Sequence, residues 1–206
     1  MAPLAQYLSP NVKTEVALAR SAAPAAISSK ATVLVLRPGG YQTIIRGTNG
    51  FTCLVERSWM SPFDSPEFWN PRMRGPICYN PPAVRSILPY TINRSNLALA
   101  GVSKAQMRAR IVATMAQHGL PAPAPGAMSY MMSKGGYLSD AGRHWYPHLM
   151  FHIATTSAAT WGADLNGSPV LYNDQYRDMP EGETIFMVTV GHWSDGSAAP
   201  PESAGM

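Results

Sequence analysis

The chain has 206 residues and a net charge of +4, and only 14% of its residues are charged. This length predicts one domain that can bury its own core. The basic residues are scattered, which disfavours a nucleic-acid-binding face, and no apolar run reaches the roughly 18 to 20 residues of a membrane span.

The N-terminal segment predicts a helix. Serine caps helices and proline suits their first position, so Ser9-Pro10 should start a helix over about residues 11–23 that stops before Pro24. Apolar side chains recur on one face of this helix, which indicates that it packs on a sheet. Residues 1–8 are expected to form a flexible N-terminus ahead of the domain.

Three strands are predicted next. Residues 32–36, 41–46 and 51–56 are apolar or alternating and rich in β-branched side chains. Pro-Gly-Gly and Gly-Thr-Asn-Gly separate them, and such turns join neighbouring antiparallel strands. The pattern therefore predicts a three-stranded meander.

The middle of the chain combines a long loop with two helices. Residues 58–82 hold six prolines and several aromatic side chains, and we interpret them as an ordered cover over one side of the core. Asn80-Pro81 should begin a short helix that runs through about Leu88. A longer helix should open at Ser103, because Gln106 completes a capping box with it.

Apolar strands return in the C-terminal half. They are predicted over residues 128–132, 148–154 and 184–190, and the last is expected to be central because it is mostly apolar. With the meander and about three helices, they predict a single α+β domain over residues 9–196, with a central antiparallel sheet and long proline-rich loops. The Ala/Pro/Ser/Gly-rich tail, residues 197–206, is expected to be disordered.

Residues 144–161 hold three of the five histidines and two of the five tryptophans. On a helix, the four-residue spacing of the histidines would let two rings reach one metal ion, but Pro147 would break that helix. On a strand, His148 and His152 would share a face at a separation of about 13 Å, which is too far for one ion. The strand is the preferred interpretation, so a three-histidine metal site is disfavoured.

Two sets of candidate site residues follow from this segment and from the C-terminal turn. The expected ligand-binding residues are the histidines and tryptophans that could line one cleft: His144, Trp145, His148, Trp161 and Trp193. The catalytic candidates are His148, His192 and Asp195, because histidine beside a carboxylate can act as a general base. Common catalytic strings such as Gly-x-Ser-x-Gly and His-Glu-x-x-His are absent.

No cofactor is predicted. Histidine with methionine can bind copper, which keeps His144, His148 and Met150 as an alternative metal site. Methionine also fills irregular gaps in cores, and we prefer that interpretation.

Five segments carry a family resemblance: GTNGFTCLVERS, GPICYN, WYPHLMF, WGADLNGSPV and VGHWSDG. They resemble segments of a group of uncharacterised, exported bacterial proteins, and the likeness extends discontinuously over residues 16–196. The resemblance implies a periplasmic or secreted protein but no activity. The N-terminus itself shows no basic region followed by an apolar core, so Ala2-Pro3-Leu4-Ala5 is compatible with a processed mature end.

The two cysteines, Cys53 and Cys78, are predicted to form a disulfide. The loop between them has little regular structure and needs a tether at its far end, and the resemblance to exported proteins points the same way. The alternative is two reduced, buried cysteines in a cytoplasmic protein.

The sequence thus predicts a secreted or periplasmic binding or accessory protein with an aromatic- and histidine-lined cleft for a small molecule. The alternative is an exported hydrolase-like enzyme, in which His148 or His192 acts as general base with an aspartate such as Asp195 or Asp164. Neither nucleic acid nor a membrane is an expected partner.

Overall fold

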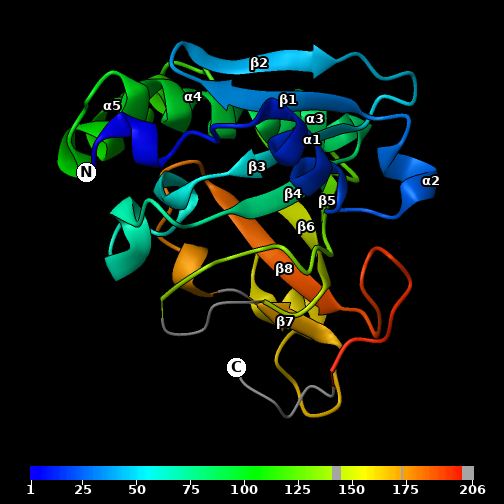
Figure 1. The fold of residues 1–206 in the computed structure, drawn as a ribbon. Helices are drawn as coiled ribbons and strands as arrows, with labels where there is room; N and C mark the ends of the chain where they lie inside the picture. The colour runs from blue at the N-terminus through cyan, green and yellow to red at the C-terminus, as the bar shows by residue number, and fades with distance from the viewer. Residues whose placement is uncertain (141–144, 173, 201–206) are drawn as a thin grey trace.

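One sheet runs through the computed structural model, which describes residues 1–140, 145–172 and 174–200. Among these residues the sheet has eight strands in the order β2-β1-β3-β4-β5-β6-β8-β7, and it twists from β2 at one edge to β7 at the other (Figure 1). The strands are β1 (Thr32–Arg37), β2 (Gly40–Ile45), β3 (Thr52–Glu56), β4 (Gly75–Tyr79), β5 (Met128–Met131), β6 (His148–Ala154), β7 (Val170–Tyr172) and β8 (Glu183–Thr189). The predicted single-domain α+β class is confirmed.

The α-helices cover the β1–β4 half of the sheet from both sides. They are α1 (Val12–Arg20), α2 (Ala25–Ser28), α3 (Pro81–Ser86), α4 (Leu88–Leu99) and α5 (Lys104–Ala116), with short 3-10 helices η1 (Leu4–Gln6), η2 (Ser58–Met60), η3 (Pro66–Trp69), η4 (Ala158–Trp161) and η5 (Asp174–Tyr176). Helix α1 packs on β1, β3 and β4, while α3 and α4 contribute to the core on the opposite face. Within the described ranges, no helix has the length and apolarity to cross a membrane.

The predicted meander is wrong in one pairing. Strand β3 lies beside β1, not β2, and runs parallel to it, with Thr32 opposite Thr52. The 47–50 turn crosses the start of β1, where Gly47 N donates to Thr32 Oγ1 at 3.0 Å and Thr32 N donates to the Phe51 carbonyl at 2.9 Å. A Cβ on Gly47 would lie 2.2 Å from Thr32 N, so this crossing requires glycine. Gly47 therefore allows the chain to cross from β2 over β1 to β3, and the 47–50 segment is not a hairpin turn.

Several boundaries also differ from expectation. The first helix is capped by Asn11, whose Oδ1 accepts from Lys13 N, and it ends at Arg20. Strand β4 lies inside the region predicted as loop. Proline is uncommon within strands, so Pro76 argued against a strand there. Helix α4 was not predicted, because Pro89 suggested that the preceding helix ends there. In the structure Pro89 lies in the first turn of α4, where proline is tolerated. Strand β7 was not predicted either, because three residues are too few to show the alternation of apolar and polar side chains that identifies a strand.

Other local predictions are confirmed. The Ser103–Gln106 capping box begins α5, Asn80 caps α3, and β5, β6 and β8 occupy the predicted segments. The N-terminus that was predicted to be flexible, residues 1–8, stands apart from these: it contains η1 and a fully buried Tyr7, whose Oη donates to the Trp69 carbonyl at 2.7 Å. Of the expected tail, residues 201–206 lie outside the described residues.

Alternation along β3 divides its residues between two environments. Cys53 and Val55 face α1 and pack in one cluster with Ala19 of that helix, while Leu54 and Glu56 face the other side. Cys53 lies opposite Cys78 on β4, and the two form the predicted disulfide. A disulfide fits an oxidising compartment.

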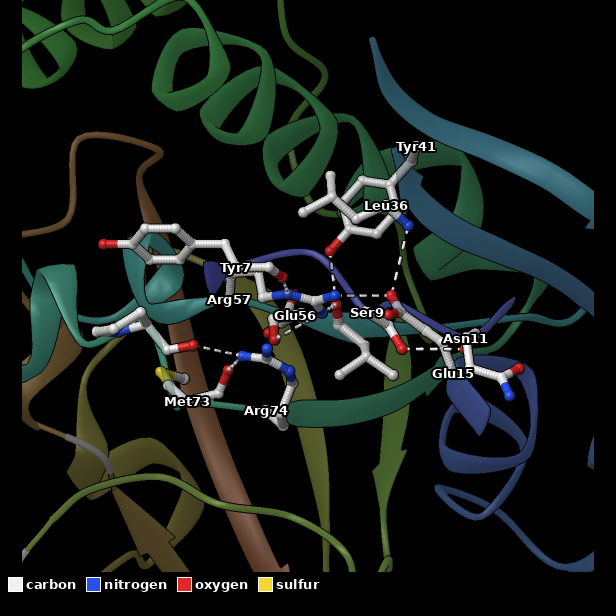
Figure 2. Close-up of polar contacts among 12 residues, drawn as sticks. Tyr7, Ser9, Asn11, Glu15, Leu36, Tyr41, Glu56, Arg57, Met73 and Arg74 are labelled. Atoms are coloured by element: carbon white, nitrogen blue, oxygen red, sulfur yellow. Dashed lines mark hydrogen bonds and ion pairs between the residues drawn. The ribbon is translucent and has the colours of Figure 1, made fainter. Parts of the chain in front are cut away.

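Arg57 follows β3 and is fully buried on the α1 side (Figure 2). Its Nε donates to the Tyr7 carbonyl at 2.7 Å, its Nη2 to Glu15 Oε1 at 2.7 Å, and its Nη1 to the Val55 carbonyl. Glu15 Oε1 also accepts from Leu36 N at 3.4 Å. The ion pair therefore ties η1, α1, β1 and β3 into one sealed unit, which we call the α1-side network.

Candidate functional site: a methionine-lined cavity

A cavity of about 530 Å³ lies on the sheet face opposite α1. Its floor comes from alternate residues of β3, β4, β5, β6 and β8, and its other walls come from α4 and from the segments around η2 and η5. Six methionines line it: Met60, Met73, Met131, Met150, Met179 and Met187. Such flexible thioether side chains adapt to apolar ligands of different shape.

Strand register brings the floor residues together. Met131 lies opposite His148, and Met150 lies opposite Met187, so their side chains share one face of neighbouring antiparallel strands. His152 continues that face along β6, two residues beyond Met150. The alternate side chains of β6, including Phe151, turn to the opposite face.

Glu56 brings a buried carboxyl to the cavity wall. Its Oε1 accepts hydrogen bonds from Tyr79 Oη at 2.6 Å and Thr91 Oγ1 at 3.0 Å. Burial raises the pKa of Glu56, while the hydrogen bonds from Tyr79 and Thr91 oppose that rise. The other oxygen, Oε2, has no hydrogen-bond partner among the described residues.

His152 stands between Glu183 and Ser129. Its Nδ1 is 3.1 Å from Glu183 Oε2, and its Nε2 is 2.9 Å from Ser129 Oγ. This order resembles a serine–histidine–carboxylate chain. Ser129, however, is fully buried and does not line the cavity, so its hydroxyl cannot meet a substrate there. The chain fixes the imidazole and leaves the Glu183 carboxylate at the cavity wall.

Arg94 is the one arginine on the cavity wall, within the part of the chain that the structure describes, and it is fully engaged by Glu181. Its Nε and Nη2 donate to the two carboxylate oxygens at 2.5 and 2.8 Å. Its Nη1 donates to the carbonyls of Trp59 and Ser61 at 3.1 and 3.2 Å. This bidentate pair neutralises both side chains, so Arg94 has little capacity to bind a further anion.

His148 is 8% exposed and also lines the cavity. Its Nδ1 is 2.7 Å from the Tyr146 carbonyl, which can only accept, so Nδ1 carries the proton. Burial lowers the pKa of His148, and the hydrogen bond to Tyr146 opposes this. The neutral ring therefore presents Nε2 as an acceptor, and no described residue donates to it.

The candidate residues from the sequence are divided by the structure. Trp145, His148 and Met150 line the cavity, and the Trp145 and His148 rings lie 6.1 Å apart. Buried Trp145 Nε1 has no hydrogen-bond partner within the part of the chain that the structure describes. Trp161 lies on the opposite face of the sheet, stacked on Phe186 at 4.7 Å.

The C-terminal candidates lie outside the cavity lining. His192 is exposed and pairs with Ala198 in an isolated bridge. Asp195 Oδ2 binds Lys134 Nζ at 2.8 Å at the surface, and Trp193 packs at the edge of the core. Asp164 accepts a hydrogen bond from Tyr172 N at 3.0 Å. His144 lies outside the described residues.

Sequence reasoning missed four acidic or basic residues of the cavity wall: Glu56, Arg94, Glu181 and Glu183. The two strand glutamates could have been noticed in the sequence. Glu56 is two residues from Leu54 and four from Thr52, and Glu183 is two residues from Ile185, so each glutamate shares a strand face with these side chains. A charge at an inward position of an apolar strand indicates a buried partner or a site. Arg94 and Glu181 gave no such signal, since they lie far apart in the chain.

Within the described ranges, no group of three or more His, Cys, Asp or Glu side chains is placed to hold a metal ion. Of the alternative copper ligands, His148 and Met150 share one face of β6.

Comparisons with known proteins give no relative from which to transfer a function. No family model, no curated protein and no solved structure matches the chain.

Proposed function

We propose that this protein binds a small, mostly apolar molecule in the methionine-lined cavity, as an exported binding or accessory protein. The cavity is the observation that carries the proposal. Its volume of about 530 Å³ falls within the roughly 300 to 1,000 Å³ typical of small-molecule sites. Its wall joins many apolar side chains to a few fixed polar groups, which is the usual composition of such sites.

Export is supported by the Cys53–Cys78 disulfide, which fits an oxidising compartment. The resemblance of five segments to exported bacterial proteins points in the same direction. The proposed location is therefore the periplasm or the extracellular space.

A hydrolase is the less favoured proposal. His148, the candidate base that lines the cavity, is held by a backbone carbonyl and not by an aspartate. The carboxylates on the described cavity wall are glutamates, and Ser129 is fully buried and does not line the cavity. The serine that lies beside a histidine–carboxylate pair is therefore not on the cavity wall.

The test is binding of N-phenylnaphthylamine, a neutral dye whose fluorescence rises in apolar surroundings. Titration of the purified, oxidised protein should give saturable enhancement. Met150→Trp places a larger side chain on the cavity floor and should weaken binding at least about tenfold. Val112→Trp adds the same indole at a half-exposed site on α5 and should leave binding unchanged.

Thermal unfolding by circular dichroism checks that both variants are folded. If Met150→Trp does not fold, the smaller Met150→Phe replaces it. Dye binding that is absent in the parent protein, or equal in folded Met150 and Val112 variants, would overturn the proposed site.

A further inference from the structure

Among the described residues, the cavity wall has more carboxylates than cations. Glu181 is matched by Arg94, which leaves Glu56 and Glu183 with only His148 and His152 as potential cations in that part of the chain. His148 is held neutral by its burial, and His152 can balance at most one carboxylate. An apolar cavity with an unmatched carboxylate favours a ligand that brings a positive charge.

Glu56 and Glu183 act on the same part of the cavity. The Tyr79 ring, which bonds to Glu56, lies 6.2 Å from the His152 ring, which bonds to Glu183. Each carboxylate has one oxygen that no described residue binds. The charges of Glu183 and His152 also act on Glu56, so the two carboxylates can attract one ammonium group to this end of the cavity, where charge-assisted hydrogen bonds would hold it.

A second acceptor lies at the other end of β6. His148 is 8% exposed, lines the cavity and has an Nε2 to which no described residue donates. His148 and His152 are four residues apart on one strand, so their side chains are separated by about 13 Å. Met150 lies between them, opposite Met187, and makes the intervening floor apolar.

We propose that the ligand is an elongated amphiphilic amine, with its ammonium group at Glu56 and Glu183, its apolar body over Met150, and a second hydrogen-bond donor at His148 Nε2. The inference rests on the proposed binding function and adds the chemical class of the ligand. It also excludes fatty acids as the preferred class, because the carboxylates would repel their head group and Arg94 is already paired.

The experiment compares four probes with the same eight-carbon chain by displacement of the dye and by titration calorimetry near neutral pH. The expected order of affinity is aminooctanol, octylamine, octanol and octanoate, from tightest to weakest. Octylamine should bind at least about tenfold more tightly than octanol, since it replaces a neutral head by a charged one.

Three variants assign the ends of the ligand. Glu183→Gln and Glu56→Gln should each reduce the ratio of octylamine affinity to octanol affinity by at least about threefold. His148→Phe should bring the ratio of aminooctanol affinity to octylamine affinity to about one. Asp178→Asn, which removes an exposed carboxylate outside the cavity, is the matched control and should alter none of these ratios.

The outcomes separate the two proposals. Octanol binding as tightly as octylamine, or octanoate binding more tightly, overturns the amine class while the apolar binding function stands. Dye and octanol that both fail to bind overturn the function itself. An octylamine advantage that survives both glutamine substitutions places the amine elsewhere and overturns the assigned site.

Discussion

Two consecutive residues, Glu56 and Arg57, lie in opposite kinds of buried environment. Arg57 turns toward α1, where each of its three nitrogens donates to a carbonyl or to Glu15 (Figure 2). Glu56 turns toward the cavity, where Oε1 accepts two hydrogen bonds and Oε2 has no partner among the described residues. Strand alternation alone separates them, because successive side chains point to opposite faces of the sheet.

The comparison teaches how a buried charge can be assigned to structure or to function. A charge with a matched counter-charge and satisfied hydrogen bonds, such as Arg57, stabilises one arrangement of the chain. A charge without them, such as Glu56, costs stability and is explained most simply by a ligand. The α1-side network and the cavity should therefore respond differently to the same kind of substitution.

The largest effect is expected in the α1-side network. Arg57→Met leaves Glu15 buried and unpaired, and should lower the free energy of unfolding by about 3 to 5 kcal/mol. Urea denaturation measures this loss. Arg46→Met, at an exposed position beyond β2, should change the free energy by less than about 0.5 kcal/mol. The double variant Glu15→Leu/Arg57→Met should recover much of the loss. A loss below about 1 kcal/mol for Arg57→Met would contradict the structural role.

The next effect concerns the disulfide on the same side of the sheet. It closes a loop with a sequence separation of 25 residues, and Cys53→Ala/Cys78→Ala should lower the free energy of unfolding by about 2 to 4 kcal/mol. At temperatures below its unfolding transition, the double variant should still bind the dye, because the cysteines do not face the cavity. Thiol counting in denatured, non-reduced protein should find no free thiol. Two free thiols would contradict the disulfide. Loss of dye binding in a folded variant would show that the cavity depends on the disulfide.

The smallest effect, and one of opposite sign, is expected at Glu56. Because burial raises its pKa in the folded state, the folded protein binds more protons than the unfolded chain between the unfolded and folded pKa values. Stability from this group is thus present at low pH and is lost as pH rises through that window. Glu56→Gln should remove this loss of stability, so the variant should unfold at a higher urea concentration than the parent near pH 7. The difference between the two urea midpoints should shrink toward about pH 4.

Urea denaturation across about pH 4 to 8 measures this gap, and Asp178→Asn, which removes an exposed carboxylate, should not reproduce it. A Glu56→Gln variant that is less stable than the parent near neutral pH would show that Glu56 is a satisfied structural charge like Arg57.

Part of the site could be read from the sequence, because local pattern fixes it. The alternation of residues 148–154 places His148 and Met150 on one strand face, and both line the cavity. Trp161 was grouped with them because it is close in sequence, but it lies beyond the strand on the opposite face. His192 and Asp195 were grouped by chemistry alone, and their turn lies outside the cavity lining.

The sequence by itself determined the features that depend on neighbouring residues: the caps at Asn80 and Ser103, the strand at 148–154 and the α+β class. Their physical cause is short-range, since hydrogen bonds to a helix end and the two-residue period of a strand involve only nearby positions. Only the tertiary structure decided that β3 crosses to β1, that Arg57 meets Glu15, and that Glu56 and Glu183 share a cavity. These contacts join segments up to 127 positions apart in the sequence, and no local pattern encodes which distant charge will be the partner.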